Sequence, residues 1–220
     1  MLALTAAGAS TAHAAESPLA AAFKKSAAQP RVQLEMAGRC EVEADKPSHC
    51  SVRIQSDRAA GYHYYRAFFG GVSIRTLRVS GRNHMDSGMF NLMAKVLAEP
   101  GEKAKKLPRC WLSEERVRED ASEEFSIGAL SAAEGFRQLR ADMRGGTITR
   151  SGRTITRVKG AERATLELDA QGRVTGGVIE DPDDGRYRMT VTYPDVPFTP
   201  VSPTPECTDE QLGDDGDQAP

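Results

Sequence analysis

Short segments of alternating apolar and polar residues, separated by turn residues, recur through the C-terminal half of this chain, and they constrain its fold more than any other feature. The clearest covers residues 185–193, where large side chains occupy every second position: Tyr187, Met189, Val191 and Tyr193. Such alternation is typical of a strand with one buried face. The connections are tight turns, for example Ser151-Gly152 and Gln171-Gly172. Because tight turns join antiparallel neighbours, the pattern predicts an antiparallel sheet built from hairpins.

The N-terminal half continues this pattern. Val32, Leu34 and Met36 alternate with polar residues, and residues 51–54 resume the alternation. Residues 61–79 hold much of the aromatic content and predict two further strands that turn near Gly70-Gly71.

Helical spacing is confined to three segments: residues 17–29, 87–97 and 131–143. The first has a capping Ser17 followed by Pro18, and the third opens with a capping box formed by Ser131 and Glu134. Strands in hairpin order with so few helices argue against a doubly wound parallel sheet. The predicted fold class is therefore α+β, mainly β.

The two ends of the chain differ in composition from the middle. Residues 1–15 are rich in small apolar residues and contain the A-x-A site Ala12-His13-Ala14, which indicates a signal peptide whose basic n-region is missing. The alternative is a disordered, Ala-rich N-terminus. We expect a single domain over residues 16–200. Residues 201–220 form a Pro-rich, acidic tail that we expect to be tied at Cys207 and otherwise disordered.

These features predict an exported protein. No later stretch approaches the roughly 18 apolar residues of a membrane span. No cysteine stands near the cleavage site, so we do not expect a lipid anchor. We expect a soluble protein that is secreted or resides in the cell envelope, without a lipid anchor.

The chain has four cysteines, all beyond the leader, and an even number fits two disulfides in an oxidising compartment. Of the three pairings we favour Cys40–Cys50, which would staple a hairpin, and Cys110–Cys207, which would tie the C-terminal segment to the body. In the chain-entropy model, closing a loop of roughly a hundred residues stabilises by at most about 4–5 kcal/mol. Zinc is the weaker interpretation, since C-x-x-C is absent and the four histidines are scattered.

Charge gives no general indication of a partner. The 29 basic and 31 acidic residues leave a net charge of −2, so no global field favours nucleic acid or an anionic membrane. Three arginines on the predicted hairpin, Arg150, Arg153 and Arg157, lack the interleaved aromatic residues of a single-strand binder. No phosphate-binding or dinucleotide-binding motif occurs.

Catalytic and metal-binding patterns are equally weak. His84, Asp86 and Ser87 are residue types of hydrolases, but G-x-S-x-G is absent, and a polar turn that caps the following helix explains them better. Residues 181–184 hold three aspartates but lack the central Gly and distal Glu of an EF-hand loop. We read His63 as a packed or edge histidine and place His49 in the cysteine hairpin turn. The sequence therefore predicts no enzyme, no metal and no cofactor.

The order of these segments resembles the bacterial LolA-like lipoprotein-carrier superfamily, particularly the actinobacterial LppX/LprG-type cell-envelope proteins. Residues 164–169 (ATLELD), 172–174 (GRV) and 188–195 (RMTVTYPD) carry most of the likeness, the last being similar to a final strand of type T-V-T-Y-S-D. In outline it covers residues 33–200. Two features depart from the family: the lipobox cysteine is absent, and the cysteine pairs with low aromatic content point to a shrunken or filled cavity.

The resemblance implies a strongly curved antiparallel sheet, an unclosed half-barrel whose mouth is covered by helices, and an acyl-chain ligand in the concavity. The predicted lining is Leu166, Leu168, Met189 and Val191 from the sheet, with Phe90, Met93, Phe136 and Leu139 from the helices. The alternative is that all eight are ordinary core residues.

Three functions remain in competition. The first is a non-enzymatic carrier of a lipid or other apolar ligand. The second is an envelope protein-interaction or stress-sensing module with a filled cavity. The third, a hydrolase, depends on His84, Asp86 and Ser87.

Overall fold

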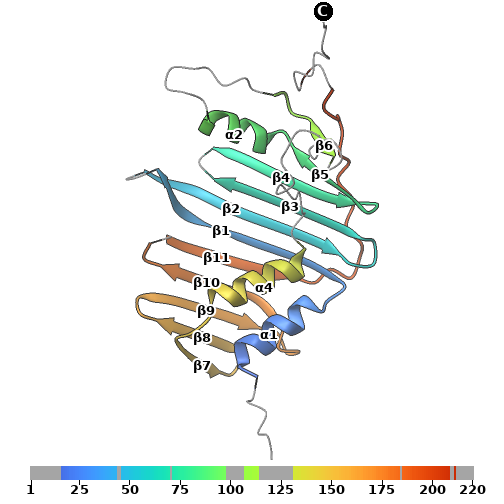
Figure 1. The fold of residues 1–220 in the computed structure, drawn as a ribbon. Helices are drawn as coiled ribbons and strands as arrows, with labels where there is room; N and C mark the ends of the chain where they lie inside the picture. Colours follow the sequence, from blue (N-terminus) through green and yellow to red (C-terminus); the bar gives the residue numbers. More distant parts are fainter. Residues whose placement is uncertain are drawn as a thin grey trace, which may run out of the picture.

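A computed structural model describes residues 16–43, 46–69, 71–97, 107–113, 131–183, 185–208 and 211. Its strands form one open antiparallel sheet of eleven strands in the order β6-β5-β4-β3-β2-β1-β11-β10-β9-β8-β7 (Figure 1). The chain runs outward from the central strand β1 to the edge strand β6, then re-enters at the opposite edge with β7 and returns to pair β11 with β1. The predicted fold class is confirmed: 51% of the residues are in strands and 18% in helices.

The first six strands are β1 (Arg31–Glu43), β2 (Lys46–Asp57), β3 (Tyr62–Phe69), β4 (Val72–Val79), β5 (Arg82–Asp86) and β6 (Trp111–Ser113). The other five are β7 (Thr147–Ser151), β8 (Thr154–Lys159), β9 (Glu162–Leu168), β10 (Val174–Asp181) and β11 (Gly185–Thr192). Two strands that are distant in sequence meet at the centre of the sheet, where Met36 of β1 lies opposite Met189 of β11.

The three predicted helices are present as α1 (Pro18–Ala27), α2 (Gly88–Leu97) and α4 (Ala132–Asp142). Ser17 caps α1 by accepting a hydrogen bond from the Ala20 amide at 3.2 Å. The capping box of α4 is complete, because the Ser131 hydroxyl accepts from the Glu134 amide while the Glu134 carboxylate accepts from the Ser131 amide. Local sequence signals therefore determine where these helices begin.

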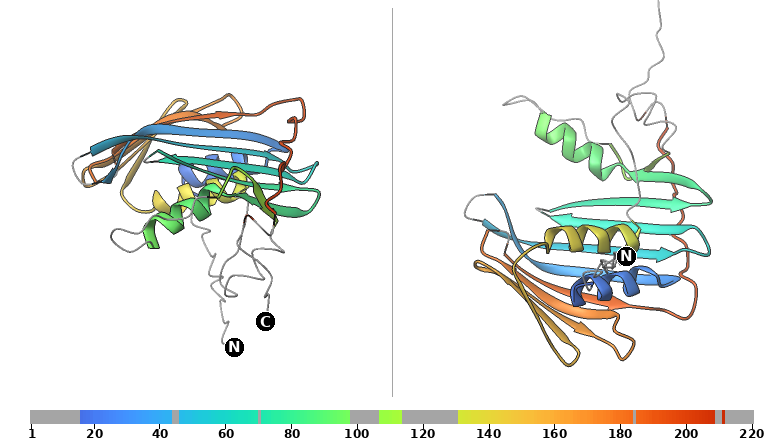
Figure 2. Two further views of the ribbon diagram at one scale, coloured as in Figure 1. Left: turned by 90° about the horizontal axis from the view of Figure 1, so that it is seen from above. Right: turned by 60° about the horizontal axis from the view of Figure 1, so that its bottom comes forward.

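Helices α1 and α4 pack together on one face of the sheet, which we call the inner face (Figures 1 and 2). The rings of Phe23 and Phe136 lie 5.9 Å apart between the two helices. Beneath them, every second residue of the central strands enters the main core, for example Leu34 and Ile54. The sheet curves around these helices, as Figure 2 shows, and leaves β6 and β7 as its two edges.

The opposite, outer face is covered at one end by the C-terminal segment. Phe198 and Val201 pack there against Tyr62, Leu77 and Trp111. The segment then continues to β6, where the Trp111 amide donates to the Pro205 carbonyl and the Cys207 amide donates to the Trp111 carbonyl, both at 2.9 Å.

The predicted Cys110–Cys207 disulfide is confirmed and closes a sequence separation of 97 residues. Cys50 is also disulfide-bonded. The side chain of Cys40, its predicted partner, lies outside the described residues, so this pairing stays a prediction. Residues 1–15, 209–210 and 212–220 lie outside them too, so the expected leader and the disordered part of the tail stay predictions.

Two local expectations were wrong. Residues 84–87 were expected in a polar turn, but the first three of them belong to strand β5 and only Ser87 lies in a turn. The strand forms because Ser80 and Gly81, at φ of 52° and 80°, make a tight hairpin turn out of β4. His49, expected in the cysteine hairpin turn, lies within β2 opposite Arg39.

Over the described residues, no helix has the length and apolar character that crossing a membrane requires.

Candidate ligand-binding site

Six of the eight predicted lining residues lie in the main core between the sheet and helices α1 and α4. Five of them are at most 5% exposed, and Leu139 packs against them half-buried: Leu166, Leu168, Met189, Val191, Phe136 and Leu139. These side chains fill the space between sheet and helices. Their role as ligand contacts stays a prediction.

The other two predicted lining residues belong to α2. Phe90 is half-buried in a separate, smaller cluster with Met85, Leu112 and the Cys110–Cys207 disulfide. The side chain of Met93 lies outside the described residues. The structure therefore divides the predicted set between two clusters.

An apolar hollow of about 240 Å³ opens on the sheet at β1, β2, β3 and β11. Its inner-face lining consists of Met36, Cys50, Val52, Phe69 and Tyr187, and Ser51 and Phe68 complete it. The hollow adjoins the main core, since Met36 and Val52 pack against that core and Met36 pairs with Met189. The volume is slightly smaller than the roughly 300–1,000 Å³ typical of small-molecule sites.

The residues of this hollow were missed by the sequence reasoning. Alternation identified Met36 and Val52 as inward-facing, and the aromatic run contained Phe69. Periodicity, however, marks a buried face without showing where along the strand the covering helices end. That boundary requires the packing of α1 and α4.

The hydrolase candidates are engaged in structural contacts. The Asp86 carboxylate binds Arg75 at 2.5 Å and accepts from the Arg75 and Gly88 amides. The Ser87 hydroxyl donates to the Pro108 carbonyl at 2.6 Å and accepts from the Cys110 amide. His84 is 6% exposed, and burial lowers its pKa. Asp86 and Ser87 thus secure the start of α2 to the disulfide segment.

A second polar group connects β2, β3 and α4. The Ser56 hydroxyl accepts from the Ala132 amide at 2.7 Å and lies 3.1 Å from His63 Nδ1. Burial, followed by the positive charge of Arg78, lowers the pKa of His63. When His63 is neutral, its Nδ1 can accept a hydrogen bond from the Ser56 hydroxyl. The Ser56 oxygen at the same time accepts from the Ala132 amide and so positions the first turn of α4. His63 is thus a packed histidine, as predicted.

A metal is not indicated by the described side chains, among which no group of three or more His, Cys, Asp or Glu residues could hold one. In the aspartate turn, the Asp183 amide donates to the Asp181 carboxylate at 2.9 Å. Asp184 lies outside the described residues.

The chain matches no protein-family model, and no curated protein is similar to it in sequence.

Proposed function

We propose that this is a non-enzymatic exported protein that binds a lipid or another apolar ligand in the inner-face hollow at Met36, Val52, Phe69 and Tyr187. The observation that carries the proposal is the nearly uniform apolar lining of this hollow, next to the main core. Water in such a hollow has few polar partners, so an apolar ligand would displace it favourably.

The resemblance to LolA-like carriers supports the same proposal. A curved antiparallel sheet that does not close, with helices over one face, is the architecture that the resemblance implies. An acyl chain could lie along the β1–β2 hairpin in the hollow and continue the apolar packing of the main core from Met189 toward Tyr187. The packed side chains beneath α4 would not have to move apart.

Export is supported by the disulfides. A buried Cys110–Cys207 bond, with both cysteines 2% exposed, is typical of proteins from an oxidising compartment. The proposed location is outside the cytoplasm, in the secreted fraction or the cell envelope.

A second function, an envelope protein-interaction or stress-sensing module, is favoured by a different observation. Five of the predicted lining residues are almost fully buried in the core, so the space that a carrier would use beneath α1 and α4 is filled. In that case the open hollow would receive a partner side chain rather than an acyl chain.

The test is native mass spectrometry of the oxidised protein purified after export, followed by solvent extraction and lipid analysis. The wild type should carry a stoichiometric acyl species or take one up on challenge. Val52→Asp should lower its occupancy by about tenfold or more, because a carboxylate would be buried against the ligand. Val178→Asp, the same change at a half-buried valine on the outer face, is the matched control.

Folding of both variants is checked by thermal melting. If Val52→Asp does not fold, Val52→Phe fills the hollow without adding charge and should also exclude the ligand. A wild-type protein that purifies without lipid and takes up none on challenge would refute the carrier function and favour the interaction module.

A further inference from the structure

A row of charged residues crosses the outer face over five adjacent strands. Glu35 of β1 lies opposite Arg53 of β2, Arg53 opposite Arg66 of β3, and Arg66 opposite Arg75 of β4. Asp86 of β5 completes the row by binding Arg75. The row therefore consists of three central cations with one anion at each end.

The two outer cations of this row are neutralised. Arg53 Nε lies 2.7 Å from Glu35, and Arg75 Nε lies 2.5 Å from Asp86. The Arg75 guanidinium also stacks over the Trp111 ring, 5.1 Å from its centroid. Arg66, at the centre, is exposed and forms no ion pair with any residue in the described part of the chain.

Like charges placed directly opposite one another on neighbouring strands destabilise a sheet. An acidic residue at position 66 would complement both Arg53 and Arg75, whereas arginine leaves one excess positive charge between them. A residue that breaks such a local rule marks a functional site when nothing else in the fold compensates for it.

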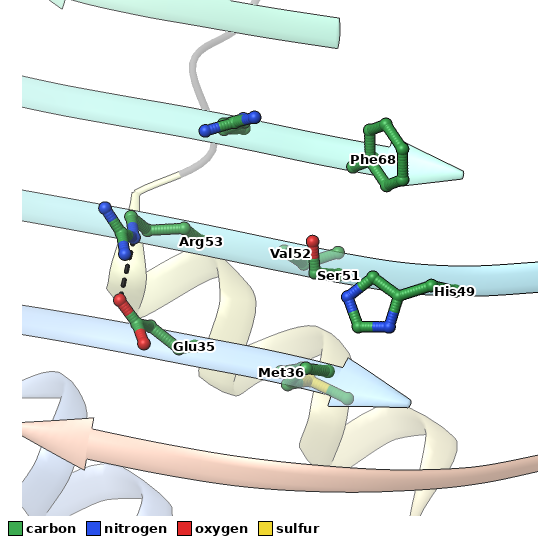
Figure 3. A pocket seen from close by; sticks show the side chains of 9 residues that line it. Glu35, Met36, His49, Ser51, Val52, Arg53 and Phe68 are labelled. Carbon is green, nitrogen blue, oxygen red and sulfur yellow. Dashed lines mark ion pairs between the residues drawn. The ribbon is translucent and has the colours of Figure 1, made fainter. Parts of the chain in front are cut away.

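Beside Arg66 the outer face is hollowed by about 320 Å³ (Figure 3). The floor is the cross-strand pair Ala37 and Ser51, whose small side chains lie between rows of long ones. Figure 3 shows the Glu35–Arg53 pair at one end of this depression and the rings of His49 and Phe68 at the other. These two rings are 6.4 Å apart.

Further positive charge surrounds the depression. Arg188 lies opposite Ala37 on β11, and Arg39 lies opposite His49; both side chains are exposed. This local excess contrasts with the net charge of −2 of the whole chain.

We propose that the outer-face depression binds an anionic ligand through a phosphate or carboxylate group, with Arg66 as its principal counterion. The guanidinium offers a planar fork of donors that fits either group, and the Ser51 hydroxyl on the floor supplies a further donor. The ligand anion takes the place that an acidic residue would occupy in the charged row. This site and the apolar hollow lie on opposite faces of the same strands, and four residues line both: Met36, Ser51, Val52 and Phe68.

Inorganic phosphate, titrated into the full oxidised chain, is the first probe. Amide chemical shifts of Ser51, Arg53, Arg66 and Phe68 should move together and saturate. Arg66→Gln should weaken binding about three- to fivefold or more, the loss expected for one exposed charge pair. Arg163→Gln, which removes an exposed arginine from β9, is the matched control and should bind as the wild type does.

A second variant tests the reasoning from stability. Arg66→Glu completes the alternation of charge along the row, so it should abolish phosphate binding while raising the melting temperature by about 1–3 °C. A lower melting temperature for Arg66→Glu would contradict the interpretation that Arg66 is uncompensated in the free protein.

Vesicles distinguish the two sources of the anionic group. Sedimentation with phosphatidylglycerol-containing vesicles, but not with pure phosphatidylcholine, and its loss in Arg66→Gln would identify a lipid headgroup. Phosphate binding without sedimentation would identify a soluble ligand. The proposal is overturned if phosphate shifts no amide around the depression, or if Arg66→Gln and Arg163→Gln weaken binding equally.

Discussion

The Ser26 hydroxyl, fully buried on α1, holds the helix to the sheet, and its removal gives the sharpest test of the packing described above. The hydroxyl accepts from the Val174 amide at 2.9 Å and donates to the Ala22 carbonyl at 2.9 Å. The Tyr193 hydroxyl lies 2.9 Å from Ser26 Oγ and 2.5 Å from the Val174 carbonyl. A β-bulge lies between Val174 and Gly176, so Ser26 takes the role of a strand partner for the Val174 amide.

The expected cost of Ser26→Ala follows from these contacts. The Val174 amide, at 0% exposure, loses its acceptor, and an unsatisfied buried donor costs about 1–3 kcal/mol. Alanine offsets roughly 0.5 kcal/mol of this through its higher helix propensity. We expect a net loss of about 0.5–2.5 kcal/mol, or about 1–10 °C in melting temperature for a chain of this size.

The assay is urea unfolding of wild type, Ser26→Ala, Tyr193→Phe and the double variant. Because both hydroxyls serve Val174, the two effects should not add, and the cycle should give a coupling of about 0.5 kcal/mol or more. Ser151→Ala, at an exposed position on β7, is the control and should change stability by less than about 0.5 kcal/mol. A Ser26→Ala protein as stable as the control would refute the assignment of Ser26 as the Val174 partner.

Two further predictions concern the disulfide and the tyrosine. Replacing Cys110 and Cys207 together by serine should cost up to about 4–5 kcal/mol, given the separation of 97 residues, and the variant should unfold at lower urea in the absence of any reductant. Burial raises the pKa of Tyr193 to about 12, against the partial opposition of Ser26 and Arg173. Because the folded-state pKa lies above the unfolded value of 10, the stability contributed by the neutral phenol is full below pH 10 and falls as the pH rises toward 12. Tyr193→Phe should lose less stability than the wild type between pH 10 and 12 in thermal melts; an equal loss would contradict this.

Local sequence patterns were sufficient to predict most helices and strands, but they were insufficient to locate the candidate binding sites. The capping box at Ser131 and the alternation in residues 185–193 depend on neighbours within a few residues, so both could be predicted. Strand β5 could not, because its sequence is polar on one side and its pairing is created by the turn at Ser80 and Gly81.

The functional candidates require register, which spacing along the chain does not give. Glu35, Arg53, Arg66 and Arg75 become one row only after the hairpins set which residues lie opposite each other. Ser26 meets Val174 across 148 positions of sequence, and nothing in the pattern of α1 distinguishes it from any other small helix residue. Six of the eight predicted lining residues do face the main core, but an apolar, inward-facing side chain can belong either to a filled core or to a cavity.

The length of the central hairpin explains why both candidate sites lie on β1, β2 and β3. A strand of 13 residues such as β1 is about 43 Å long, whereas helices of 10 and 11 residues are only about 15–17 Å long. Helices α1 and α4 therefore cover the half of the hairpin around Leu34 and Ile54. Met36 and Val52 are the last described residues of the two strands that pack against the main core, and next to them the inner face opens into the apolar hollow. On the outer face of the same strands, the small pair Ala37 and Ser51 leaves room for the anionic ligand.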